Sequence, residues 1–102
     1  MKTAYSIYLD YQKALRDAAA LEHTAGDIRK EKNRMAARRN DIAAEWAGEA
    51  SDEFVDKLIE TEERLGTLER EVLKAAEIIR RTAASAYRAE KKAIDLASRR
   101  TY

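Results

Sequence analysis

The sequence contains no cysteine, no proline and only three glycines, and 7% of its 102 residues are aromatic. Without cysteine the chain has no disulfide, no thiolate nucleophile and no cysteine-ligated metal. Without proline almost nothing interrupts a helix, and much of the 45% hydrophobic content is alanine, the best helix former. Basic and acidic residues nearly balance at a formal net charge of +1, so no global field holds a polyanion. These absences favour an all-α protein of long, charged helices.

Long hydrophobic runs are also missing. No apolar run approaches the ~20 residues that span a bilayer. The opening segment, MKTAYSIYLDYQ, reaches Asp10 too early for the apolar core of an export signal and has no small-residue cleavage site. We therefore expect no membrane span and, if the chain is exported, a route that does not use a signal peptide.

The positive signal is a heptad pattern in both halves of the chain. Steps of four and three residues from Phe54 to Leu96 meet thirteen positions, none of them charged. The same stepping from Ile7 to Trp46 meets two basic intrusions, Lys32 and Arg39. The pattern predicts one helix over about residues 3–44 and a second over about residues 52–98.

A turn is expected between these helices, over about residues 45–51. Gly48 tolerates the backbone conformation that ends a helix, Ser51 can cap the next one, and Asp52 with Glu53 suits its positive N-terminal end. Because no long loop is available, the helices should fold back as an antiparallel hairpin, a single domain over residues 1–102. Its core is expected from the heptad positions Leu21, Ile28, Met35, Ile42, Phe54, Leu58, Leu65, Leu68, Val72 and Ile79.

Two helices side by side bury one apolar stripe each, and this buried area is small for a stable fold in a short chain without a disulfide or metal. The second helix carries another, interrupted apolar stripe, which we expect to form a partner interface. It consists of Val55, Ile59, Gly66, Leu73, Ala76, Ala83, Tyr87 and Ile94. Our hypothesis is that two such hairpins, identical or related, pair into a four-helix bundle.

The segment RKEKNRMAARR, residues 29–39, carries six basic residues against Glu31. NRMAARRN resembles the basic region of zipper-type transcription factors, but Asn40 and Asp41 replace residues that contact DNA in that family, and acidic residues follow. In a hairpin that turns near Gly48 the run would lie opposite an acidic segment. The sequence therefore favours a neutralised helix face over nucleic-acid binding, which stays as an alternative.

No catalytic constellation is visible. His23 is the only histidine, and with Asp27 it does not make a metal site. The carboxylates are spread over solvent-facing helix without a nucleophile and base set. We expect no enzyme, no metal and no cofactor.

Trp46, Ala47 and Gly48, followed by Phe54 on the next helix, stand at the centre of a chain of about one hundred residues. This arrangement resembles the WXG family of small helical hairpins, similar to the early secreted antigens of type VII (ESX) secretion. The resemblance covers essentially the whole chain. It implies Trp46 and Gly48 as the turn motif and dimerisation with itself or a related hairpin. It further implies export by a membrane ATPase complex of Gram-positive bacteria, as a substrate or as the co-secreted partner of a larger toxin with an N-terminal helical hairpin.

One family element is absent. A C-terminal Tyr-x-x-x-Asp/Glu export signal is not present, because Lys91 stands four positions after Tyr87, and Tyr102 does not restore the pattern. This favours a partner that supplies the signal. An intracellular helical-hairpin adaptor, unrelated to secretion, stays open as an alternative.

Overall fold

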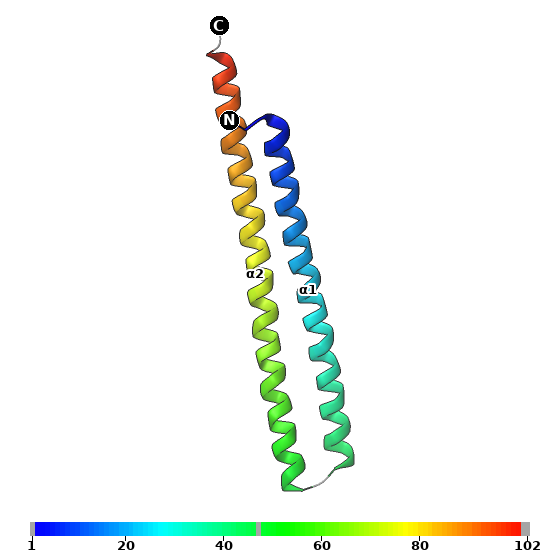
Figure 1. The fold of residues 1–102 in the computed structure, drawn as a ribbon. Coiled ribbons are helices and arrows are strands. Elements are labelled where there is room, and N and C mark those ends of the chain that lie inside the picture. Colours follow the sequence, from blue (N-terminus) through cyan, green and yellow to red (C-terminus); the bar gives the residue numbers. More distant parts are fainter. Residues whose placement is uncertain (1, 47, 101–102) are drawn as a thin grey trace. The chain divides into compact units, whose positions relative to one another are not determined.

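The computed structural model describes residues 2–46 and 48–100, and in this part of the chain it contains two helices and no strand (Figure 1). Helix α1 spans Ala4–Glu45 and helix α2 spans Glu49–Arg99. The predicted all-α hairpin of two antiparallel helices is confirmed. Helix α2 begins three residues before the expected position, and the motif residue Ala47 and the C-terminal Tyr102 lie outside the described residues.

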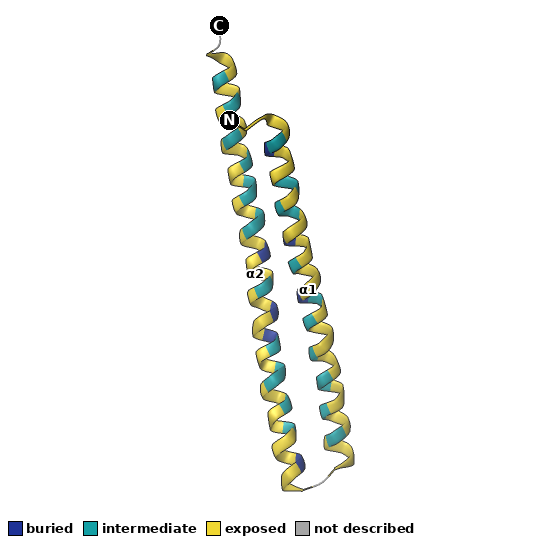
Figure 2. Ribbon diagram, in the orientation of Figure 1, coloured by how far each residue is buried: buried dark blue, intermediate teal, exposed yellow. Residues whose placement is uncertain are grey.

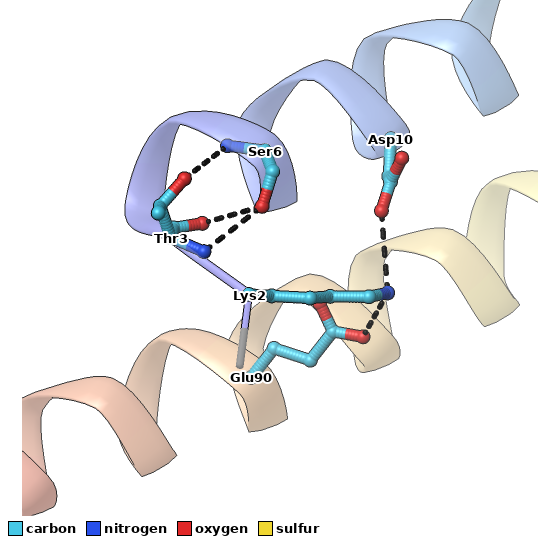
Figure 3. A network of polar contacts seen from close by, with 5 residues as sticks. All are labelled: Lys2, Thr3, Ser6, Asp10 and Glu90. Atoms are coloured by element: carbon cyan, nitrogen blue, oxygen red, sulfur yellow. Dashed lines mark hydrogen bonds and ion pairs between the residues drawn. The ribbon is translucent and has the colours of Figure 1, made fainter.

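Helix α1 begins at a reciprocal side-chain cap. The backbone N–H of Ser6 donates to Thr3 Oγ1, and the backbone N–H of Thr3 donates to Ser6 Oγ, each at 3.0 Å (Figure 3). The first helical bond follows from Ile7 N–H to the Thr3 carbonyl at 3.0 Å. Two backbone donors that a helix start leaves without intrahelical partners are thus satisfied by short hydroxyl side chains.

The turn is tight and depends on one glycine. Trp46 N–H donates to the Ile42 carbonyl at 2.8 Å and closes α1, while Asp52 N–H donates to the Gly48 carbonyl at 3.1 Å and opens α2. Gly48 has a φ of +123°, a conformation that residues with a Cβ rarely adopt. Gly48 therefore reverses the chain.

Ser51 has a different role from the expected helix cap. Because α2 starts at Glu49, Ser51 lies inside its first turn, and its buried hydroxyl donates to the Trp46 carbonyl at 3.4 Å. It thereby satisfies an acceptor at the end of α1. Glu49 and Asp52 stand in the first turn of α2, where a negative charge stabilises the helix dipole.

The chain divides into two compact units. Unit 1 combines Met1–Leu21 with Lys74–Tyr102, and unit 2 is Glu22–Leu73. Within each unit a segment of α1 packs against a segment of α2, and the buried and half-buried positions follow the sides where the two segments face each other (Figure 2).

Little of either unit is fully buried. Among the described residues the buried hydrophobic side chains are Ile7, Ala18 and Ala76 in unit 1 and Ala25 in unit 2. Three of these four are alanines, so few large apolar side chains are fully withdrawn from water within either unit.

Candidate interaction surface

Charged side chains occupy the helix contact of unit 2. Glu69 of α2 is 7% exposed, and Arg29 of α1 binds it through Nε at 3.0 Å and Nη2 at 2.9 Å, while Lys32 Nζ lies 3.5 Å from its other oxygen. One heptad earlier on α2, Glu62 accepts from Arg39 Nε at 2.8 Å and from Nη2 at 3.3 Å. Each carboxylate thus has a cationic partner on the opposite helix, as groups withdrawn from water require.

These contacts shift the pKa values of Glu69 and Arg39 in the direction that keeps each side chain ionised. Hydrogen bonding from Arg29 lowers the pKa of the Glu69 carboxyl, assisted by the charges of Arg29 and Lys32 and opposed by desolvation. The hydrogen bond to Glu62 raises the pKa of Arg39. Glu69 therefore stabilises the folded state above the ordinary glutamate pKa of about 4.3, and this contribution is lost as the pH falls through its lowered pKa.

The residues predicted for the hairpin core fall into two groups. Eight of the ten are half-buried: Leu21, Ile28, Met35, Ile42, Leu58, Leu65, Val72 and Ile79. Phe54 and Leu68, in contrast, are 48% and 45% exposed. The structure differs from the expectation at these two positions because α2 turns the neighbouring row, which includes Glu62 and Glu69, toward α1. Arg29, Lys32 and Arg39 of α1 neutralise Glu62 and Glu69, so these two glutamates can face α1.

The residues predicted for the partner interface are also divided by the structure. Gly66 and Ala76 are buried within their own units, Val55, Ala83, Tyr87 and Ile94 are half-buried, and Ile59 and Leu73 are each 38% exposed. Of this set, only Ile59 and Leu73 present large, exposed apolar side chains in the single chain.

Uncharged residues of α2 that recur every seven positions are mostly exposed in each unit. We define the α2 stripe as the seven residues, spaced seven apart, Phe54, Thr61, Leu68, Ala75, Thr82, Ala89 and Leu96. Six of them are exposed and Thr61 is half-buried. In unit 2, Phe54 borders a hollow of about 480 Å³ with Met35, Ile42 and Leu58. In unit 1, Leu96 is 44% exposed, and Ile78, beside the stripe, is 48% exposed.

The turn presents a second apolar group. Trp46 is 60% exposed, so its indole does not plug the end of unit 2 in the single chain. Gly48 holds the reversal two residues later. The arrangement leaves the indole available to another molecule.

Unit 1 carries a polar network where the chain enters α1. Lys2 Nζ lies 3.1 Å from Glu90 Oε1 of α2 and 3.2 Å from Asp10 Oδ2 of α1 (Figure 3). The hydrogen bond to Glu90, followed by that to Asp10, raises the pKa of the Lys2 ammonium. Nearby, Tyr11 and Tyr87 stack with ring centroids 4.9 Å apart. These contacts connect the start of α1 to α2 within unit 1.

The basic run of residues 29–39 is largely engaged inside unit 2. Arg29 and Lys32 bind the buried Glu69, Arg39 binds the half-buried Glu62, and Arg34 Nη1 lies 3.2 Å from Glu31 of its own helix. Four of the six cations thus already have carboxylate partners. The geometry supports a neutralised helix face and offers no free basic helix to a DNA groove.

Groups suited to chemistry are sparse. His23 Nδ1 lies 3.5 Å from Asp27 Oδ2, and both side chains are exposed. Across residues 2–46 and 48–100 no cluster of three or more histidine or carboxylate side chains is placed to hold a metal ion. In the same part of the chain, neither helix has an apolar segment long enough to cross a membrane.

The described residues thus form a helical hairpin with a tryptophan and a glycine beside its turn and an uncharged, mostly exposed stripe on α2. A family model described as "Proteins of 100 residues with WXG" matches residues 6–91, so the chain belongs to the WXG100 family. This is the family of small helical-hairpin proteins of type VII secretion, which are secretion substrates and not known enzymes. No curated protein and no solved structure matches the chain.

Proposed function

We propose that the protein is a type VII secretion substrate, or the co-secreted partner or chaperone of one, and that it acts without catalysis by burying its α2 stripe against a second helical hairpin. The product is a four-helix bundle. The observation that carries this proposal is the exposure of large apolar side chains on α2, where Phe54, Leu68 and Leu96 share one uncharged row. Family membership supports the secretion part.

The energetic reason for pairing is the thin interior of each unit. With mainly alanines buried, hydrophobic burial within the chain is small, and the large apolar side chains remain in contact with water. Fully burying one leucine or phenylalanine stabilises by about 1.5–3 kcal/mol. A partner that covers the α2 stripe supplies the burial that a lone hairpin lacks.

Export would follow a signal-peptide-independent route from the cytoplasm. We assign the turn motif to Trp46 and Gly48, and the exposed indole fits a docking contact with a secretion component or partner. Because Tyr87 is stacked on Tyr11 and lacks an acidic residue four positions later, we propose that a partner supplies the export signal.

Secretion in paired bacterial strains tests this function. The tagged chain, together with its genetic neighbours, is produced in a strain with an active type VII system and in one lacking the membrane ATPase, and culture medium and cells are separated. We expect the chain in the medium of the first strain only. Trp46→Ala should lower export, whereas Tyr5→Ala, which removes a 70% exposed aromatic side chain in unit 1, should not.

Retention of the chain in the cells of both strains, with an intact active system, would favour the intracellular adaptor instead. Equal export from both strains would separate the protein from type VII secretion altogether.

A further inference from the structure

The side chains of Tyr11 and Tyr87 join α1 to α2 within unit 1. Their rings stack with the centroids 4.9 Å apart and an angle of 23° between the ring planes. Rings this close and nearly parallel have carbon atoms in van der Waals contact. Lys91 Nζ lies 6.0 Å from the centre of the Tyr87 ring, a distance at which the ring attracts the cation. The structure thus holds two phenols from distant parts of the sequence against each other.

The surroundings of the two rings leave them accessible and free to turn. Both tyrosines are half-buried, so each keeps some contact with water. They border a hollow of about 160 Å³ that is also lined by Ala14, Ala83 and Ala86. Because alanine presents only a methyl group, the phenol rings can move into this hollow without displacing a large side chain.

We propose that Tyr11 and Tyr87 are a site of oxidative modification, at which the two rings are joined as dityrosine and α1 becomes covalently linked to α2. The oxidant is hydrogen peroxide, used by a haem peroxidase that removes one electron at a time. The chain contains no cysteine, so a disulfide cannot supply such a link. The modification concerns a contact within unit 1, so it depends neither on the partner nor on the export route of the proposed function.

The reaction balances with hydrogen peroxide alone. Each phenol loses one electron and its hydroxyl proton and becomes a phenoxyl radical. The two radicals form a bond between the ring carbons ortho to the oxygens, and the hydrogen on each of these carbons moves to the phenol oxygen of its own ring. One hydrogen peroxide takes up the two electrons and the two protons and becomes two water molecules. The cross-linked chain is therefore lighter than the natural chain by two hydrogen atoms.

Peroxidase treatment of the full chain at low concentration tests the site. We expect the blue fluorescence of dityrosine and a tryptic product that joins residues 3–13 to residues 82–88, the second of which contains Tyr87 as its only tyrosine. Tyr11→Phe and Tyr87→Phe should each lose most of this fluorescence, because phenylalanine keeps the stacked ring and removes the phenol. Tyr5→Phe, which changes a 70% exposed tyrosine of the same unit, should keep it.

The melting temperature provides a second measurement. Tyr11 and Tyr87 are 76 positions apart in the sequence, and a covalent bond between such distant residues restricts the unfolded chain. Treatment should therefore raise the melting temperature of the natural chain and leave that of Tyr87→Phe unchanged.

Three results would overturn the inference. The first is a natural chain that forms no dityrosine, and the second is equal fluorescence in the natural chain, Tyr11→Phe and Tyr87→Phe, which would mean that other tyrosines react. The third comes from treating a mixture of isotope-labelled and unlabelled chains. If the linked peptides combine one labelled and one unlabelled half, the bond lies between chains and does not join α1 to α2 within unit 1.

Discussion

At the scale of single residues, the turn depends on the backbone of Gly48. Its φ of +123° is unfavourable for any residue with a Cβ, yet beyond Gly48 and its two chain neighbours no heavy atom lies within 4 Å of where that Cβ would stand. Gly48→Ala should therefore lower the free energy of unfolding by about 1–3 kcal/mol through backbone strain alone. Urea denaturation followed by circular dichroism measures this change.

Gly26 is the matched control for this substitution. It lies within α1, and an added Cβ there also meets no atom within 4 Å. Gly26→Ala should stabilise the protein by about 0.5–1 kcal/mol, because alanine suits a helix better than glycine. Equal effects at the two glycines would mean that the strain assigned to Gly48 is absent.

Glu69 predicts a pH dependence at the same scale. Its pKa is lowered by Arg29, so its stabilising contribution is complete above the ordinary glutamate pKa of about 4.3 and disappears as the pH falls through the lowered value. Glu69→Gln should therefore destabilise the protein clearly at pH 7 and much less at pH 3. Thermal unfolding of the mutant and the natural chain from pH 7 to pH 3 measures how far the difference between their melting temperatures decreases.

The exposed Glu71 on the same helix provides the comparison for Glu69. Glu71→Gln should change the melting temperature little at either pH, because the side chain is exposed. The ionic role of Glu69 would be contradicted if the melting temperatures of Glu69→Gln and the natural chain differed by the same amount at pH 7 and at pH 3.

At the scale of the helices, opposite charges in the contact of unit 2 select how α1 and α2 align. Arg39 and Glu62 form the shortest of these ion pairs, at 2.8 Å. Arg39→Glu or Glu62→Arg alone should lower the melting temperature, since each leaves like charges half-buried between the helices. The double exchange should recover most of that loss.

Exchanging Arg64 and Glu60 provides the control for this cycle. This pair, at 3.1 Å, lies on one helix with both side chains exposed, so single and double changes should have little effect. If the double exchange of Arg39 and Glu62 were as unstable as the sum of its single changes, the pair would not be aligning the helices.

The helices themselves were predictable from the sequence. The lack of proline, the heptad periodicity and the position of Gly48 are local signals, and local signals determine where helices run and end. The alignment of the basic run with acidic α2 residues also followed from counting outward from the turn. The sequence predicts a start of α2 that is three residues too late, because Ser51 resembles a cap, whereas in the structure Gly48 takes that position.

The absence of charge did not identify which row of α2 packs against α1. Periodicity reveals which residues share a face, but two neighbouring rows satisfy it equally well. The missed signal was in the charges: Lys32 and Arg39 are seven residues apart on α1, as are Glu62 and Glu69 on α2. In the structure Lys32 pairs with Glu69 and Arg39 pairs with Glu62. The charged row of α2 therefore faces α1, and Phe54 and Leu68 stay exposed.

At the scale of the whole molecule, the charged row and the uncharged row of α2 suit two kinds of contact. The row with charges fits the contact between α1 and α2 of unit 2, where Arg29, Lys32 and Arg39 match it. Among the described residues, six of the seven members of the uncharged α2 stripe are exposed, which suits a contact between hairpins.

The most direct test of this account is the mass of the folded particle in solution, measured by sedimentation equilibrium for the natural chain and two variants. Leu68→Glu puts a charge in the α2 stripe, and Leu9→Glu makes the same change at a leucine of equal exposure on α1, 44% against 45%. We expect the natural chain and Leu9→Glu to form dimers at micromolar concentration. Leu68→Glu should weaken the dimer about a hundredfold or more, because a charge is buried at the contact without a partner. A natural chain that is a stable, folded monomer, or two variants that dimerise equally, would contradict the central claim.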